Sequence, residues 1–182
     1  MSVTINGSAG VTTNSGAVYD SLQTGTAKAY NWNGLTTNTY IDFTGIPSWV
    51  KRITVMLNGV SVSGTSVILI QLGDSGGVEI TGYLSVGSRV AGSTAASTGY
   101  TTGFGLASAN AATSVYSGSI ILTLVDSSNT WVANGVVADT AATYTTFTSG
   151  TKQASATLDR VRITTVNGTD TFDAGTINII YE

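Results

Sequence analysis

Hydrophobic and polar residues alternate along much of this chain with the two-residue period of a β-strand. Residues 160–166 alternate in this way, with Val161 and Ile163 in the apolar positions. In residues 52–57 every second side chain is a large aliphatic one: Ile53, Val55 and Leu57. Because successive side chains of a strand point to opposite faces, each segment is predicted to cover a core with one face and to meet solvent with the other.

Two further segments, residues 66–72 and 119–125, are apolar on both faces. A strand without alternation is typically buried on both sides, so each is predicted to lie beneath either a second layer of this chain or a partner subunit. Short runs rich in Val, Ile, Thr, Tyr and Phe predict further strands at residues 40–43, 78–83, 130–133, 143–148, 153–158 and 176–181.

Asn-Gly pairs recur along the chain, and both residues tolerate the positive φ of a tight hairpin turn. The pairs begin at residues 6, 33, 58, 134 and 167. Asn58-Gly59 directly follows the strand of residues 52–57 and is predicted to form a hairpin tip. No segment of helical length has the apolar spacing of an amphipathic helix. The predicted fold is therefore all-β, a β-sandwich or jelly-roll-like domain.

Composition divides the chain into two parts. Residues 1–27 are rich in Thr, Ser, Gly and Asn with isolated apolar positions, which is typical of an extended arm that becomes ordered on another protein. Residues 28–182 contain the predicted main strands and all three Trp, and are predicted to form the β-sandwich. Within this domain, residues 91–102 are small and polar and are predicted to form a long surface loop.

The 182-residue chain is poor in charge: 9% of its residues are charged, 7 basic and 10 acidic, against about 25% in a typical soluble domain. It has no His and no Cys, which excludes His-based triads, Cys nucleophiles, disulfides, and zinc or haem ligand sets. No cofactor is predicted. Scattered basic residues predict no nucleic-acid binding, the apolar runs are far shorter than the roughly 18 residues of a membrane span, and no signal peptide is visible.

One short motif matches the sequence around the nucleophile of trypsin-like proteases: Gly73-Asp74-Ser75-Gly76-Gly77. That chemistry requires a general base, supplied by a His, to accept the serine proton, and this chain has no His. The motif is therefore predicted to be a Gly-rich turn. A pair of carboxylates could in principle hydrolyse glycosides, but most of the acids lie at predicted turns. The chain is predicted not to be an enzyme.

Three oxygen-bearing side chains near one predicted hairpin are the candidates for a metal site: Asn167, Asp170 and Asp173. Such ligands suit Ca²⁺. Their spacing does not fit the EF-hand loop, and Asn-Gly followed by Thr-Asp is also an ordinary hairpin turn. No metal is therefore predicted, and these residues are the candidates if one is bound.

Aromatic residues supply the candidates for receptor or partner binding: Tyr30, Trp32, Tyr40, Trp49 and Trp131. Exposed Trp and Tyr rings commonly bind sugar rings and protein partners. In a β-sandwich such rings also fill the core, so both interpretations stay open at this point.

Several stretches resemble proteins of tailed bacteriophages. Residues 1–13 (M-S-V-T-I-N-G-S-A-G-V-T-T) resemble the start of many tail-fibre-like proteins. Residues 43–60 (F-T-G-I-P-S-W-V-K-R-I-T-V-M-L-N-G-V) resemble a domain near the C-terminus of phage fibre and other virion proteins, and residues 68–74 and 158–179 continue this likeness. The resemblance covers most of residues 28–182 and attaches no catalytic residues. It implies a trimeric phage structural protein with an all-β tip.

Three functions are consistent with these patterns. The first is a short tail- or head-fibre protein of the virion, assembled in the host cytoplasm. It would attach to capsid, portal or tail proteins through residues 1–27 and contact the host surface, including its glycans, with residues 28–182. The second is a capsid or tail decoration (cement) protein that stabilises the virion. The third is a carbohydrate-binding module without a virion role. A homotrimer is expected for the first two, and a monomer for the third.

Overall fold

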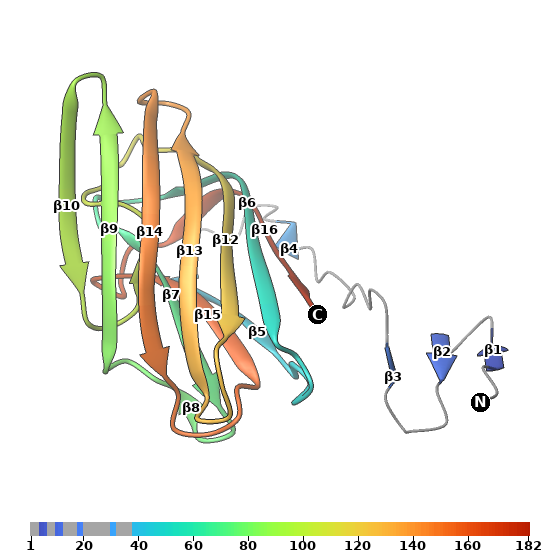
Figure 1. Ribbon diagram of the computed structural model, residues 1–182. Coiled ribbons are helices and arrows are strands. Elements are labelled where there is room, and N and C mark those ends of the chain that lie inside the picture. The colour runs from blue at the N-terminus through green and yellow to red at the C-terminus, as the bar shows by residue number, and fades with distance from the viewer. Residues whose placement is uncertain (1–3, 7–9, 13–17, 20–29, 32–37) are drawn as a thin grey trace.

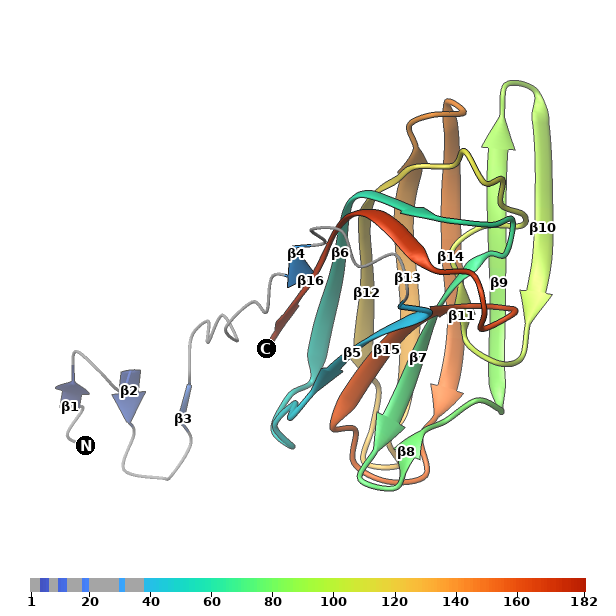
Figure 2. The same ribbon diagram turned by 180° about the vertical axis from the view of Figure 1, so that it is seen from behind.

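The structure is a computed structural model, and it describes residues 4–6, 10–12, 18–19, 30–31 and 38–182. In this described part every regular element is a β-strand, and the main strands form two antiparallel sheets that face each other (Figures 1 and 2). The prediction of an all-β sandwich is confirmed. No helix in the described residues is long and apolar enough to cross a membrane.

The larger sheet has eight strands, which follow one another in space in the order β10 (Thr94–Tyr100), β9 (Tyr83–Ala91), β14 (Tyr144–Gln153), β13 (Thr130–Asp139), β12 (Tyr116–Leu124), β6 (Arg52–Val62), β16 (Phe172–Tyr181) and β4 (Tyr30–Asn31). The smaller sheet has five: β11 (Phe104–Gly105), β7 (Ile68–Asp74), β15 (Arg160–Thr165) and β5 (Tyr40–Thr44) in order, with β8 (Gly77–Val78) paired to β7. Three short strands near the N-terminus pair with one another: β1 (Thr4–Asn6), β2 (Gly10–Thr12) and β3 (Val18–Tyr19). Most of the predicted arm, residues 1–27, lies outside the described residues.

The core fills the space between the two sheets with the inward-facing side chains predicted from the alternation. The branched aliphatic residues of β6 and β15 are buried on the inner faces, whereas the residues between them are more exposed. Large aromatic and aliphatic side chains from both sheets complete the core, among them Tyr83, Phe104, Tyr116, Ile120 and Leu122. Burial of this apolar surface is the main stabilising contribution to the fold.

The two segments predicted to be covered on both faces differ in outcome. All seven residues of β7 are buried, because Leu69 on its outer face packs with Val67 and Tyr100 of the same chain. On β12 the inner residues are buried, but Ile121 on the outer face is only half-buried. The described part of the chain therefore supplies a second layer over β7 and none over β12.

Asn58-Gly59 does not form the predicted hairpin tip, because β6 continues through it to Val62. The register of β6 against β12 shifts here, so that two residues of β6 lie opposite the single residue Ser117. Gly59 has φ of 65°, and its N–H donates to the Ser117 hydroxyl at 2.9 Å. The pair forms a β-bulge. Like the hairpin turn that the sequence predicted, this kind of bulge requires a glycine with positive φ.

Asn134-Gly135 is likewise not a turn but part of β13, paired on both sides. Gly135 is required there for space: a Cβ at this position would lie 2.6 Å from the carbonyl oxygen of Ser119 and 2.7 Å from the Cα of Ile120. Asn167-Gly168 does form the predicted turn, with Gly168 at φ of 67°.

Three other local predictions are wrong. Residues 91–102 are not a loop, since most of them form β10, which pairs with β9 along its whole length. The side chains of β10 are exposed over most of its length, so burial contributes little to this strand. Its backbone hydrogen bonds to β9 are what define it. Residues 78–83 and 153–158 are not continuous strands but mostly connections between β8 and β9 and between β14 and β15.

The motif at residues 73–77 is a turn, as predicted, between β7 and β8. Asp74 accepts hydrogen bonds from the Gly76 amide at 2.7 Å and from the Ser155 hydroxyl at 2.6 Å, while Ser75 is exposed. These contacts connect the turn to the loop that follows β14.

A nearly buried ion pair joins Lys152 of β14 to Glu79, whose carboxylate also accepts a hydrogen bond from the Ser155 amide at 2.7 Å. The side chains of Lys152 and Glu79 are 6% and 17% exposed. Burial alone would raise the pKa of Glu79, but hydrogen bonds from Lys152 and Ser155 outweigh burial, so its pKa lies below the ordinary value of 4.5.

Substitution of Gly135→Ala should destabilise the fold by about 1–3 kcal/mol, because the added methyl group meets the backbone of β12. Asn134→Ala, next to it on the outer face, is the control and should change the free energy of unfolding by less than about 0.5 kcal/mol. Urea denaturation of both variants measures the difference. Equal effects would contradict the placement of this pair inside β13.

Substitution of Glu79→Gln should lower the free energy of unfolding at neutral pH by about 3 kcal/mol, because it leaves the Lys152 ammonium buried and unpaired. The depressed folded-state pKa of Glu79 stabilises the native state above pH 4.5, and this contribution is lost as the pH falls below that value. The gap between wild type and variant should therefore narrow on acidification.

The control for this pair is Glu182→Gln, in the exposed pair with Arg52, where a change below about 0.5 kcal/mol is expected. Urea titrations between neutral and acidic pH measure both variants. A gap between wild type and Glu79→Gln that stays constant with pH would contradict the assignment.

Candidate functional site

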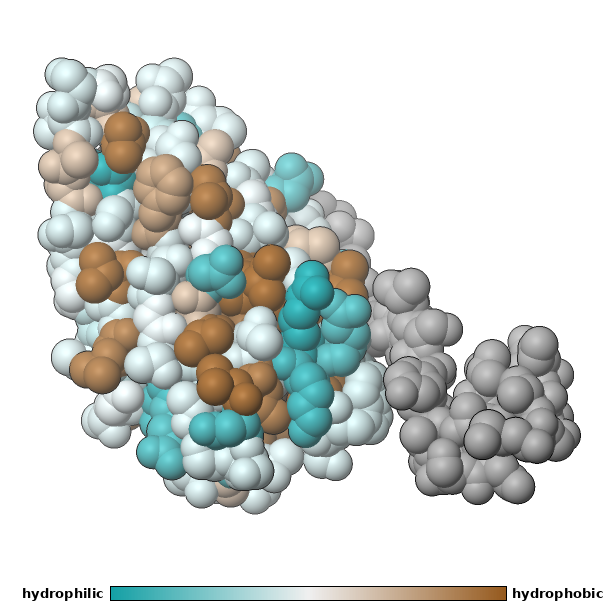
Figure 3. All heavy atoms as spheres, in the orientation of Figure 1, coloured by the Kyte–Doolittle hydropathy of each residue, from teal (hydrophilic) through white to brown (hydrophobic). Residues whose placement is uncertain are grey.

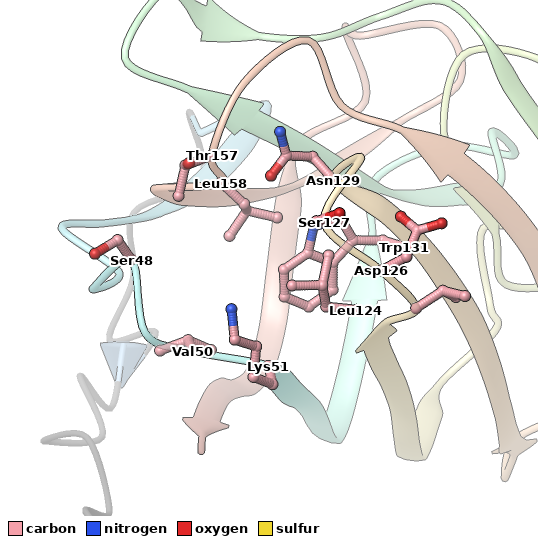
Figure 4. Close-up of a pocket in the computed structure, with 11 residues that line it drawn as sticks. Ser48, Val50, Lys51, Leu124, Asp126, Ser127, Asn129, Trp131, Thr157 and Leu158 are labelled. Carbon is pink, nitrogen blue, oxygen red and sulfur yellow. The ribbon is translucent and has the colours of Figure 1, made fainter. Parts of the chain in front are cut away.

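A pocket of about 370 Å³ opens at one end of the sandwich, where three connections converge (Figure 4). They are the segment before β6, the turn between β12 and β13, and the loop between β14 and β15. The lining residues are Ser48, Val50, Lys51, Leu124, Val125, Asp126, Ser127, Asn129, Trp131, Thr157 and Leu158. Antiparallel pairing brings these connections to the same end of the two sheets.

The indole of Trp131 belongs to both the core and the pocket. Trp131 lies at an inward-facing position of β13, is 2% exposed, and has its ring among the pocket-lining residues (Figure 4). Its Nε1–H is buried and has no hydrogen-bond partner within the described structure. A buried donor without a partner costs about 1–3 kcal/mol, so an acceptor atom that reached this N–H would be bound favourably.

The turn between β12 and β13 is held in shape by Asp126. Its carboxylate accepts hydrogen bonds from the Ser128 hydroxyl at 2.6 Å and the Ser128 amide at 2.9 Å, which together lower its pKa. Asn129 follows with φ of 60°, and its carbonyl accepts from the Ala154 amide at 3.0 Å. The left-handed backbone suits Asn and places its side chain in the pocket lining.

Lys51 supplies a positive charge at the pocket. Its backbone is fixed by a bond from its amide to the Glu182 carbonyl and by one from the Leu124 amide to its own carbonyl, both 2.8 Å. Its ammonium group points toward the pocket (Figure 4). Among the residues that the structure describes, no carboxylate lies within ion-pair distance of this ammonium.

The lining therefore combines an aromatic ring and aliphatic side chains with hydroxyl, amide and ammonium groups. Such a mixture suits a ligand with many oxygen atoms and an apolar face, as a sugar ring has. Asp126 is the one carboxylate in the lining, whereas glycoside hydrolysis by paired acids requires two.

The structure separates the aromatic residues that the sequence offered as candidates. Trp131 lines the pocket, and Trp49 lies on the neighbouring segment, 43% exposed, with its ring 6.0 Å from that of Tyr181. Tyr40 lies on the smaller sheet and is 48% exposed. The side chain of Tyr30 and all of Trp32 lie outside the described residues.

Tyr40 lines a second hollow of about 430 Å³ on the outer face of the smaller sheet. The guanidinium of Arg162 lies 3.9 Å from the centre of the Tyr40 ring and donates two hydrogen bonds, of 2.7 and 2.6 Å, to Asp42. The Asp42 carboxylate raises the pKa of Arg162. Gln71 donates to the Thr102 carbonyl at 2.8 Å. Since these polar groups already bind one another, this hollow is less suited to a ligand than the end pocket.

The three candidate metal ligands are only partly brought together. Asn167 donates to Asp170 at 2.7 Å, and Asp170 also accepts from the Ser66 amide at 2.9 Å. Asp173, on β16, accepts a hydrogen bond from Ser61 of β6. In the described part of the chain no group of three or more His, Cys, Asp or Glu side chains is placed to hold a metal ion.

Sequence reasoning missed most of the pocket. Ser48, Lys51 and Asn129 lie far apart along the chain or in separate segments, so no local pattern in the sequence groups them with Trp131. The pattern that could have found them is the convergence of three connections at one end of a sandwich, which requires the strand order. Of the lining residues, the sequence pointed to Trp131 alone.

Comparison with known proteins gives no relative: no family model, no curated protein and no solved structure matches this chain.

Proposed function

We propose that this chain is a structural protein of a tailed-phage virion, of the short tail- or head-fibre type, that binds a host-surface glycan through the pocket around Trp131. In this proposal residues 1–27 attach the protein to other virion proteins, and the chain assembles as a homotrimer. The virion role is supported by the resemblance of residues 1–13, 43–60 and 158–179 to phage fibre proteins. The glycan is supported by the chemistry of the pocket.

The observation that carries the glycan proposal is a pocket lined by both Trp131 and Lys51: the buried indole N–H has no hydrogen-bond partner, and the ammonium group has no ion-pair partner, in the described residues. Both groups are donors that lack acceptors there, so the pocket favours a ligand rich in oxygen. The Lys51 ammonium favours a glycan with an acidic substituent, such as a uronic acid, over a neutral one.

Two substitutions test the pocket. Lys51→Met keeps the aliphatic stem and removes the charge, and it should weaken binding of an acidic glycan about tenfold, or about 1.4 kcal/mol. Trp131→Phe keeps an aromatic ring and removes the N–H, and it should weaken binding about fivefold, because one hydrogen bond contributes about 1 kcal/mol. A glycan array identifies the ligand, and calorimetry measures the affinities.

Arg52→Met is the matched control, because it removes the neighbouring cation, which does not line the pocket. It should leave the affinity unchanged. Equal losses from Lys51→Met and Arg52→Met would show a general effect of charge and would contradict binding in the pocket. Absence of binding to every acidic and neutral glycan on the array would overturn the proposed function.

A further inference from the structure

The outer face of the larger sheet carries large apolar side chains that nothing in the described chain covers. We define this outer face by the outward-pointing residues of β9, β14, β13 and β12. Figure 3, which views the molecule from this side, shows apolar residues distributed over the face among weakly polar ones and some strongly hydrophilic ones. Six exposed large hydrophobic residues belong to it: Leu84, Val86, Val90, Val132, Val136 and Phe147.

Strand register places these side chains side by side. Phe147 lies opposite Val136, and Val136 lies opposite Ser119, whose other neighbour is Met56. Leu84 and Val132 both lie opposite Thr151. The face therefore consists of rows of apolar, hydroxyl and amide side chains that run across the strands, with Asn134 among them, and the rows continue onto β6.

No outward-pointing residue of these four strands is charged. The charged residues that the strands do contain are on the inner side. Lys152 and Asp139 are 6% and 2% exposed, and the Arg89 guanidinium lies 5.2 Å from the centre of the Tyr144 ring. Packing against the outer face therefore requires no charge to be removed from water.

We infer that the outer face is the surface through which copies of this chain pack against one another. This inference rests on the self-assembly that the proposed function includes, and it names the surface responsible. The face carries no charge pattern that would select an oppositely charged partner, and two identical neutral faces do not repel each other. Packed sheets about 10 Å apart, with apolar side chains between them, are an ordinary arrangement of β-proteins.

The size of the face agrees with a stable assembly. With β6 and β16 included, six strands spaced about 4.8 Å apart and about nine residues long cover about 860 Å². Two copies that packed these areas fully against each other would bury about 1,700 Å², within the range of about 1,200–2,000 Å² found for specific interfaces, and in the proposed homotrimer each copy divides its area between two neighbours. The added strands contain charged residues only near their ends, at Arg52 and Asp173.

Light scattering of the full chain and two variants tests the inference. Wild type should have a solution mass of about three times the 18.5 kDa of one chain, as the proposed homotrimer requires. Val136→Asp places a charge at the centre of the outer face and should reduce the mass to that of one chain. Val166→Asp is the matched control, because Val166 is 49% exposed and Val136 is 52% exposed. Val166 lies in the turn directly after β15, away from the outer face of the larger sheet. The control should keep the wild-type mass.

Circular dichroism and thermal unfolding check that the variants are folded, and Phe147→Ser provides a milder change to the same face if Val136→Asp does not fold. An oligomer that persists in every folded outer-face variant would overturn the assignment of the surface. A monomeric wild type would overturn self-assembly through this face altogether. Glycan binding by a monomer would leave the pocket proposal intact, so the two failures are distinguishable.

Discussion

The rest of the structure depends on the burial of alternating apolar side chains between two antiparallel sheets. Most of the long strands contribute inward-facing residues to this layer, so one face of each sheet is committed to the core, whereas the side chains of the edge strand β10 are largely exposed. On the outer side of the smaller sheet, Tyr100 and Val67 cover β7. The described chain covers only the inner side of the larger sheet. The outer face of the larger sheet and the end pocket both lie at the boundary of this core.

The charged side chains are also arranged in relation to the two sheets. The ion pairs lie near strand ends, at Arg52, Lys152 and Arg160, or on the outer face of the smaller sheet, at Arg162. The few charged residues of the chain are therefore not spread evenly over the surface. The broad face from β9 to β12 is neutral, and the end pocket has a cation without a carboxylate partner in the described structure. These two surfaces are physically distinct, which is why one is assigned to contact between copies and the other to a polar ligand.

The end pocket is formed jointly by local turns and by the core of the sandwich. Its walls come from turns whose shape is set locally, as Asp126 sets the turn before Asn129. Its base is a core residue, Trp131, whose N–H is left without a partner by the described packing around it. The two sheets fix the relative positions of these turns, and with them the backbone positions of the residues that line the pocket.

The sequence by itself determined the all-β class, the inward positions of β6 and β15, and the turns at residues 73–77 and 167–168, because two-residue periodicity and glycine-rich turns are local properties. Only the tertiary structure decided that Asn58-Gly59 is a bulge and Asn134-Gly135 part of a strand, since both depend on the neighbouring strand β12. It also decided that residues 94–100 form a strand, through pairing with β9. Finally, it brought Lys51, Asn129 and Trp131 to the lining of one pocket. Local chemistry limits what each segment can be, but the choice among the remaining possibilities comes from the partner strand, which lies far away in the chain.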